Sequence, residues 1–243
     1  MKNYLSFGGG VNSVAMMLYL LDEGWDFEAV FVDHGGDWPE TYSYLLMFQG
    51  WLKKNNHKPI TVLKPDVGTV EKMRFDNIYD YYHFKKINPI ASSRMCTHRF
   101  KIDVIQKYYE KPCFNFMGID YGEAHRATGG IHKNVENRYP LIEAEMNRDD
   151  CENYIKNHNL PVPVKSGCYF CPFQRIYDWK ELRHKHPDLI CKAEQLENRY
   201  ADRRKKEGKK PLWILKKPIK VAIEEDQYKL FEIDEYPPCN CML

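Results

Sequence analysis

The feature that most constrains the fold is the alternation of short apolar runs with helix-like segments in residues 1–63. Residues 4–7 form an apolar run that ends in three glycines, and apolar side chains then recur at helical spacing as far as Gly24. Residues 27–33 and 60–63 form two more runs, and Pro39 suits the first turn of the helix expected between them. This order predicts a parallel sheet with right-handed helical crossovers, which binds ligands at the carboxyl ends of its strands.

The rest of the chain is less regular. Residues 70–111 predict helices and a long loop around residues 92–101, and residues 113–118 predict another strand. Helices are expected over residues 149–157 and 182–206, followed by a proline-interrupted tail from Pro211. Because the alternation fades between residues 139 and 163, we expect an α/β domain over residues 1–140. A helical, cysteine-containing region over residues 141–243 is expected to pack with it as one unit.

The composition is that of a globular protein, with 43% hydrophobic and 29% charged residues. No apolar run approaches the ~18 residues of a membrane span, and residues 1–25 lack the pattern of a signal peptide. We therefore expect a cytoplasmic protein with no membrane partner. Disulfides are rare in that compartment, so the 8 cysteines are buried fillers, metal ligands or reactive thiols.

The glycine loop of residues 6–13 (SFGGGVNS) is the first segment with chemical information. Glycines allow close approach of an anion, and the following helix adds the positive end of its dipole. The loop lacks the Gly-Lys-Ser/Thr ending of a Walker loop. It predicts a phosphate site, and the alternative is a plain strand-to-helix turn that uses glycine.

Four segments resemble a known family. Residues 6–13 resemble the PP-loop (usually Ser-Gly-Gly-x-Asp-Ser) of the adenine nucleotide alpha-hydrolase superfamily. Within that superfamily, residues 31–42 (FVDHGGDWPETY) are similar to the Asp-Thr-Gly and Pro-Glu-Thr-Tyr segment of phosphoadenosine phosphosulfate (PAPS) reductases. Residues 93–101 (SRMCTHRFK) and 167–172 (GCYFCP) are similar to their cysteine segments. The resemblance implies a Rossmann-like α/β fold, with a twisted parallel sheet and helices on both faces.

The resemblance also implies that the ligand is ATP or PAPS, and it leaves open whether Mg²⁺ binds with it. The residues implied to surround the nucleotide are Ser6, Gly8, Gly9, Gly10, Asn12, Ser13, Asp33, Gly35 and Gly118. Arg126 and Lys101 are expected to neutralise its anionic end and to act in catalysis. In a reductase the nucleophile is a tail thiol, here Cys239 or Cys241, and a thioredoxin-like reductant resolves the S-sulfocysteine that forms.

The chain departs from the family pattern at three places. The PP-loop aspartate, which helps hold Mg²⁺ in ATP-cleaving members, is Asn12, a weaker ligand for a hard cation. The tandem cysteine pair of the adenylylsulfate-reducing members is reduced to Cys96 alone. The Cys-Gly-x-His tail of the reductases is replaced by residues 239–243 (CNCML).

The Cys168-x-x-Cys171 turn can present two thiolates to one metal, and a redox dithiol or two buried fillers are the alternatives. With Cys96 and the tail thiols available, we expect a soft metal site, and the resemblance favours a 4Fe-4S cluster over zinc. Cys239 or Cys241 either completes the ligand set or leaves one iron open. The remaining three cysteines have no partner spacing and are interpreted as fillers: Cys113, Cys151 and Cys191.

The sequence thus leaves three functions open. The leading hypothesis is a PAPS or adenylylsulfate reductase-like enzyme. The second is a PP-loop ATP pyrophosphatase that inserts sulfur into DNA or tRNA, with a cysteine desulfurase as sulfur donor, and the third is a non-enzymatic nucleotide- or cluster-sensing module. The basic segment between Arg203 and Lys217 favours a nucleic-acid substrate, although most such runs are solvated helix faces. A homodimer is also left open.

Overall fold

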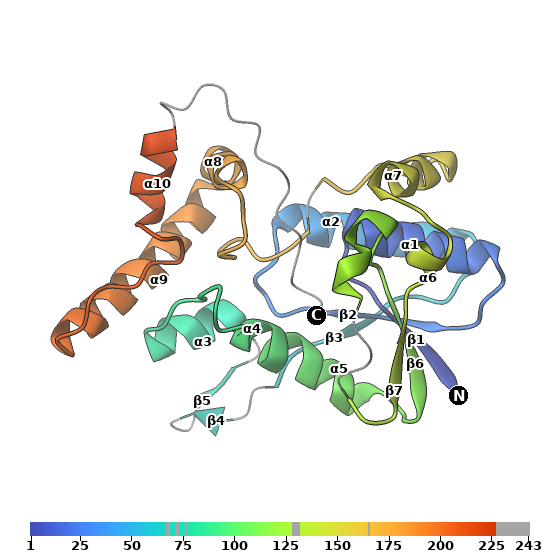
Figure 1. Cartoon of the computed structure of the whole chain (residues 1–243), viewed down its shortest axis with the longest axis horizontal. Helices are drawn as coiled ribbons and strands as arrows, with labels where there is room; N and C mark the ends of the chain where they lie inside the picture. The colour runs from blue at the N-terminus through green and yellow to red at the C-terminus, as the bar shows by residue number, and fades with distance from the viewer. Residues whose placement is uncertain (67–68, 71–72, 76, 128–131, 165, 227–243) are drawn as a thin grey trace.

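A five-stranded parallel sheet in the order β3-β2-β1-β6-β7 forms the right-hand part of the molecule in Figure 1, together with the helices that cover it. The computed structural model describes the whole chain except residues 67–68, 71–72, 76, 128–131, 165 and 227–243. In the register of the sheet, Leu5 lies opposite Ala29 on one side and Phe116 on the other. The strands are β1 (Lys2–Ser6), β2 (Glu28–Val32), β3 (Thr61–Leu63), β6 (Cys113–Met117) and β7 (Val135–Arg138).

Helices cover both faces of this sheet, because alternate strand residues point to opposite sides. Leu5, Phe31 and Phe116 join the core formed with α1 (Val11–Asp22), α2 (Pro39–Lys54) and α7 (Arg148–Asn157). Tyr4 and Val30 belong to a smaller core on the other face, against α5 (Asp103–Tyr108) and its flanks. The short α6 (Pro140–Glu143) lies beside α1 (Figure 1). The predicted α/β fold with helices on both faces is confirmed.

A second core begins immediately after β2 with Trp38, whose Nε1 donates to Gln174 Oε1 at 2.9 Å. It buries large side chains such as Tyr82, Phe100 and Trp179. Its helices are α3 (Ile78–Lys85), α4 (Met95–Thr97), the π-helical turn η1 (His98–Ile102), α8 (Ile176–Lys185), α9 (Pro187–Lys206) and α10 (Ile219–Asp226). The remaining elements are the antiparallel β4 (Thr69–Val70) and β5 (Met73–Arg74), and the 3-10 helix η2 (Tyr121–Arg126).

The structure differs from the sequence prediction at three elements. The loop predicted around residues 92–101 is largely helical, in α4 and η1, because Phe100 is buried in the second core. The helix predicted over residues 182–206 is two helices, since α8 ends before Pro187 and a proline disfavours helical backbone in the residue that precedes it. The edge strand β7 has only one buried residue, Val135, and so carries little apolar signal. The domain boundary at residue 140 stays a prediction.

Within the described ranges, no helix combines the length and the apolar character that a bilayer crossing requires.

Gly118 controls how closely β6 approaches the start of α1. A methyl group on Gly118 would lie 3.0 Å from the backbone carbon of Asn12 and 3.0 Å from the backbone nitrogen of Ser13. We predict that Gly118→Ala lowers the free energy of unfolding by about 1–3 kcal/mol, because neither backbone can move independently. In the matched control Gly50→Ala, the new methyl meets nothing within 4 Å. That variant should be neutral or more stable in urea denaturation, and equal stability of the two variants would contradict the account.

Candidate functional site

Three loops meet at the carboxyl ends of β1, β2 and β6. From β1 the chain passes to β2 and β3 on one side, and later returns to β6 and β7 on the other side. Such a reversal of strand order opens a crevice outside the strand ends, where ligands of α/β proteins bind. We therefore take this crevice as the candidate site, and the ligand and the residues that bind it stay predictions.

The glycine loop after β1 presents backbone amides rather than side chains. Gly9 has a φ of +71°, and a methyl group there would lie 2.8 Å from Thr41 Cγ2. Gly10 precedes α1 and makes no side-chain capping hydrogen bond, while the hydroxyl of Ser13 donates to the Gly10 carbonyl at 2.9 Å. Because no side chain caps the start of α1, its first amides and its dipole are available to an anion.

A buried carboxylate stands directly behind the loop. Asn12 donates from Nδ2 to Asp120 Oδ2 at 2.8 Å and accepts at Oδ1 from Arg148 Nη1 at 3.3 Å. Asp120 is 4% exposed and also accepts from the Glu123 amide at 3.0 Å. The amide that replaces the usual PP-loop aspartate is thus held between a carboxylate and a guanidinium.

Asp33 and Gly35 form a rigid corner after β2. Asp33 Oδ1 accepts from the Gly35 amide and from the Tyr42 hydroxyl, both at 3.0 Å. Burial, together with the charges of Asp37 and Asp33, raises the pKa of Tyr42, so its hydroxyl stays a donor. Gly35 has a φ of +71° and lies against Asn77, the residue that caps α3.

The Cys-x-x-Cys turn is joined to the end of β2 by backbone pairing. Asp37 and Cys168 form an antiparallel bridge. The Trp38 amide donates to the Gly167 carbonyl at 3.1 Å, and the Tyr169 amide donates to the Gly36 carbonyl at 2.9 Å. This pairing places the Cys-x-x-Cys turn beside the segment that follows the Asp33 corner, and Ser166, just before the turn, lies against Gly10 of the glycine loop.

Two buried polar side chains lie at this junction. His34 Nε2 is 3.4 Å from Asp37 Oδ1, and the two residues are 1% and 6% exposed. Burial lowers the pKa of His34, and the nearby Lys101 lowers it further, although Asp37 opposes both effects. We therefore expect His34 to be a neutral imidazole in the resting protein. Its Nδ1 accepts from the Gly36 amide at 3.1 Å, which fixes the proton on Nε2, facing Asp37.

Cys96 and Cys168 are free thiols at the edge of the second core. The pKa of Tyr82 is raised, mainly by burial and in smaller part by the nearby thiols of Cys96 and Cys168. Both thiols therefore lie close to the Tyr82 hydroxyl. Burial likewise raises the pKa of the Cys168 thiol, which Lys101 lowers in part. Cys171 is also a free thiol, and its amide donates to the Cys168 carbonyl at 3.1 Å to close the turn. Three of the predicted ligands therefore come from one region of the fold.

These thiols do not by themselves make a metal site. In the part of the chain that the structure describes, no three His, Cys, Asp or Glu side chains are grouped so that they could hold a metal ion. Cys239 and Cys241, predicted as nucleophile or further ligand, lie outside the described residues. The ligand chemistry fits a thiolate-bound group, and the complete ligand set stays a prediction.

Other predicted site residues have structural partners. The Ser6 hydroxyl donates to Asn115 Oδ1 at 2.9 Å, so only its backbone faces the loop. Arg126 is 7% exposed and pairs with Glu123 at 2.5 Å. Sequence reasoning missed Asp120 and Arg148 as partners of Asn12. Asp120 could have been found from its place just after a predicted strand, whereas Arg148 carries no such signal.

Sequence comparison finds a distant relative of this chain among known proteins. No family model matches the sequence. An uncharacterized protein of Methanocaldococcus jannaschii is 25% identical over 234 residues, which cover 86% of this chain and 45% of the relative. This chain therefore spans less than half the length of that relative.

The fold matches a solved structure of known activity. A PAPS reductase from Candida auris, solved as a phosphate complex, superposes with a TM-score of 0.51 at 12% identity. The match covers 69% of this chain and 81% of the reductase. The chain thus has the fold of a PAPS reductase, and the resemblance inferred from its motifs is confirmed at the level of the fold.

The pairing of Asn12 with Asp120 can be tested by restoring the usual loop carboxylate. In Asn12→Asp two carboxylates face each other in a confined site, which costs free energy unless one is protonated or a cation intervenes. We predict that unfolding free energy at neutral pH falls by about 1–3 kcal/mol, and that Mg²⁺ restores part of it. Chemical denaturation with and without Mg²⁺ measures this. The control Asn12→Ala should show no recovery with Mg²⁺, and an equal response of both variants would contradict the prediction.

Proposed function

We propose that this protein binds an adenine nucleotide across the carboxyl ends of β1, β2 and β6 and acts in sulfur chemistry as a PAPS reductase-like enzyme. The observation that carries the proposal is the uncapped start of α1 next to the glycine loop, a geometry suited to a phosphate chain. The fold of a PAPS reductase solved with phosphate supports it.

The described residues divide into two groups around such a ligand. The amides of residues 8–10 and the start of α1 would bind the phosphates, and the rigid corner of Asp33 and Gly35 would border the adenosine. Lys101 acts on the pKa of both His34 and Cys168, so its ammonium lies close to the Cys-x-x-Cys turn. It would bind the anionic end of the nucleotide there, and Arg126 would add a second positive charge.

The reductase reaction needs a nucleophilic thiol, for which we propose Cys239 or Cys241. The thiolate would attack the sulfur of the PAPS sulfate group, and the bond from that sulfur to the bridging oxygen would break. The nucleotide bisphosphate leaves with the electron pair, and the cysteine becomes an S-sulfocysteine. A thioredoxin-like dithiol would then release sulfite and be oxidised to its disulfide.

A second candidate is ATP-dependent sulfur insertion into nucleic acid. The Asp120 carboxylate behind Asn12 favours it, because an oxygen ligand for Mg²⁺ is retained beside the loop although the loop itself lacks one. In this reaction an oxygen of the substrate attacks the α-phosphate of ATP and pyrophosphate leaves. The terminal sulfur of a persulfide supplied by a cysteine desulfurase then displaces AMP, which leaves a disulfide between the donor cysteine and the substrate. A second thiol attacks the donor cysteine's sulfur, forms a disulfide with it and leaves the sulfur on the substrate. Nucleotide binding without any turnover would instead favour a sensing module.

We also propose that Cys96, Cys168 and Cys171 hold a 4Fe-4S cluster, with a tail cysteine or a substrate atom at the fourth iron. All three are free thiols, Cys96 and Cys168 pack against the same core, and Cys171 closes the turn that carries Cys168, which supports the proposal. The three thiols would have to move closer together to hold the cluster, because they are not grouped as a metal site in the described residues. A bound cluster would supply a Lewis-acidic iron next to the anionic end of the nucleotide. The chain's own contribution is to hold two of these thiols on the turn that is bridged to β2.

The nucleotide site is tested by Gly9→Ala. A side chain at a φ of +71° costs about 1–2 kcal/mol, and its contact with Thr41 would displace the loop amides. We predict that affinity for ATP or PAPS falls by about tenfold or more in calorimetry. Gly24→Ala is a matched control, since Gly24 has the same φ of +71° with nothing within 4 Å of the added methyl. Equal nucleotide affinity in the two variants would refute the proposed site.

The wild-type protein then separates the two reactions. Release of sulfite from PAPS with a thioredoxin-like reductant identifies a reductase, and release of pyrophosphate from ATP identifies sulfur insertion.

The cluster is tested by its iron content. We predict that anaerobically purified protein is brown and carries about four irons and four sulfides per chain. Cys168→Ser should lose most of the iron and the visible absorption. The control Cys191→Ser should keep both, because Cys191 is exposed on α9 and is not the buried filler that the sequence predicts. A colourless protein, or equal iron in the two variants, would exclude the cluster.

A further inference from the structure

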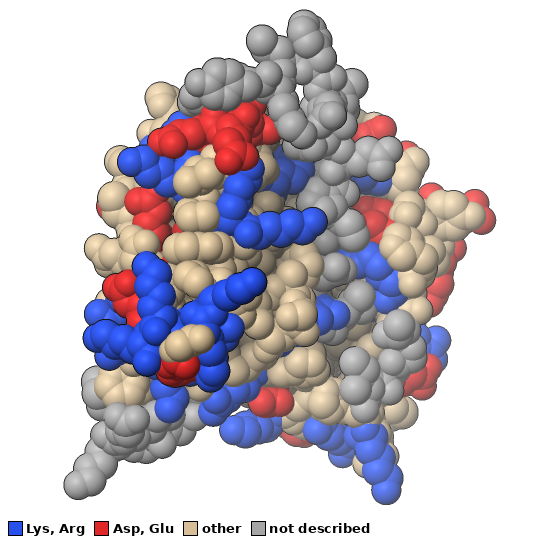
Figure 2. All heavy atoms as spheres, turned by 60° about the vertical axis from the view of Figure 1, so that its left-hand side comes forward, with Lys and Arg blue, Asp and Glu red and all other residues tan. Residues whose placement is uncertain are grey.

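A hollow lined by cations lies between the end of α3 and the side of α9. Its volume is about 870 Å³, and its lining includes Phe84, Lys85, Lys86, Arg199 and Arg203. The surrounding surface is basic. On the face that Figure 2 brings forward, Lys and Arg gather in a patch with few acidic side chains among them.

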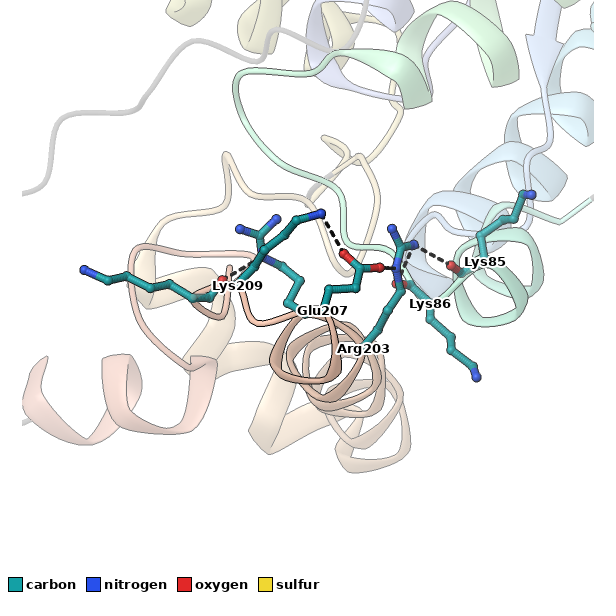
Figure 3. A network of polar contacts seen from close by, with 7 residues as sticks. Lys85, Lys86, Arg203, Glu207 and Lys209 are labelled. Atoms are coloured by element: carbon teal, nitrogen blue, oxygen red, sulfur yellow. Dashed lines mark hydrogen bonds and ion pairs between the residues drawn. The ribbon is translucent and has the colours of Figure 1, made fainter.

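Two arginines fix the shape of this hollow. Arg199 Nε donates to the His83 carbonyl at 3.3 Å, and Arg203 Nη1 donates to the Lys85 carbonyl at 3.1 Å (Figure 3). They satisfy carbonyls at the end of α3, where the helix dipole favours positive charge. These hydrogen bonds hold both guanidinium groups at the wall of the hollow, and a guanidinium has further N–H donors with which it can bind a phosphate beside the lysines.

The lysines are left with a large excess of positive charge. Asp80 is the one carboxylate among the residues that line the hollow, against four lysines and arginines. Outside the lining, Arg203 and Lys209 pair with Glu207 at 2.9 Å and lower its pKa to about 2. Arg204 is turned toward the Lys210 carbonyl, to which its Nε donates at 2.6 Å. Among the described residues, no carboxylate forms an ion pair with Lys86, Lys205 or Lys206, all of which are exposed. The patch is therefore suited to a polyanion.

The hollow adds aromatic surface to this charge. Phe84 and His83 line it and are partly exposed, and they lie at the point where the cations converge. Cations along a groove together with aromatic faces are what proteins use to bind unpaired nucleotides, with the lysines on phosphates and a base on the ring. An acidic peptide would use the cations alone.

Helix α3 connects the hollow to the candidate nucleotide site. At its first residue the Ile78 amide donates to the His34 carbonyl at 2.9 Å, and its last residue is Lys85 in the hollow wall. A helix of 8 residues is about 12 Å long, since each residue adds about 1.5 Å. A single-stranded nucleic acid bound in the hollow could therefore reach the carboxyl ends of the β-strands within a few nucleotides.

We propose that the hollow and its lysines bind single-stranded nucleic acid, with an unpaired base in the hollow, and deliver a neighbouring nucleotide to the site at the strand ends. The binding itself rests on the charges and the hollow. The delivery rests on the proposed function, in its sulfur-insertion form.

The test is the affinity of the full chain for a fluorescent single-stranded oligonucleotide, measured by anisotropy across a range of salt concentrations. Lys85→Ala with Lys86→Ala removes the two lysines that line the hollow. This double variant should weaken binding by about tenfold or more at low salt and reduce the salt slope by about 1.4, or 0.7 for each lost phosphate contact. A blunt duplex of the same length should bind more weakly than the single strand, because its bases cannot enter the hollow.

The matched control is Lys53→Ala with Lys54→Ala. Like Lys85 and Lys86, these are two consecutive lysines at the C-terminal end of a helix, here α2, and removing them changes net charge equally. An equal loss of affinity in both double variants, or no loss in the first, would overturn the proposal. Polyglutamate competing as well as the oligonucleotide would also overturn it. ATP and PAPS binding should be unchanged in both variants. If the wild type binds oligonucleotide but no nucleotide, the proposed function fails and the nucleic-acid site stands.

Discussion

The structure depends on the short backbone pairing between the segment after β2 and the segment that carries Cys168. Without it, the Cys-x-x-Cys turn and the helices that follow would have no fixed relation to the sheet. The pairing allows no side chain at Gly36, where a methyl group would lie 2.7 Å from Ile78 Cγ2 and 3.2 Å from Cys168 Sγ. One glycine therefore allows the segment after β2, the start of α3 and the Cys-x-x-Cys turn to pack against one another.

The glycine loop is the second constraint on function. It presents amides and a helix dipole to the crevice, while its side chains are turned to structural partners. Asn12 shows how the loop differs from the usual sequence, because its amide is held by Asp120 and Arg148 rather than offered to a cation. The negative charge at the site is therefore on Asp120, which contacts the loop through Asn12, and not on the loop itself. This difference bears directly on whether the nucleotide is cleaved with Mg²⁺.

Much of this arrangement could be predicted from the sequence. The period of the apolar runs predicted the sheet and its helices, and the glycines after the first strand predicted the position of the crevice. Both signals come from residues that are close together in the chain. The contacts that close the site are of another kind. Asp37 meets Cys168, and Asn12 meets Arg148, across more than a hundred residues, and no local pattern records such pairs. The burial that makes residues 95–102 helical also comes from distant partners of Phe100.

Hydrogen-deuterium exchange with and without nucleotide tests the central claim most directly. If ATP or PAPS lies across the strand ends, the amides of residues 8–13 and 33–36 should exchange more slowly on binding, while the exposed C-terminal end of α2 should be unaffected. Binding that leaves the glycine loop unprotected, or that protects only residues far from the ends of β1, β2 and β6, would contradict the account.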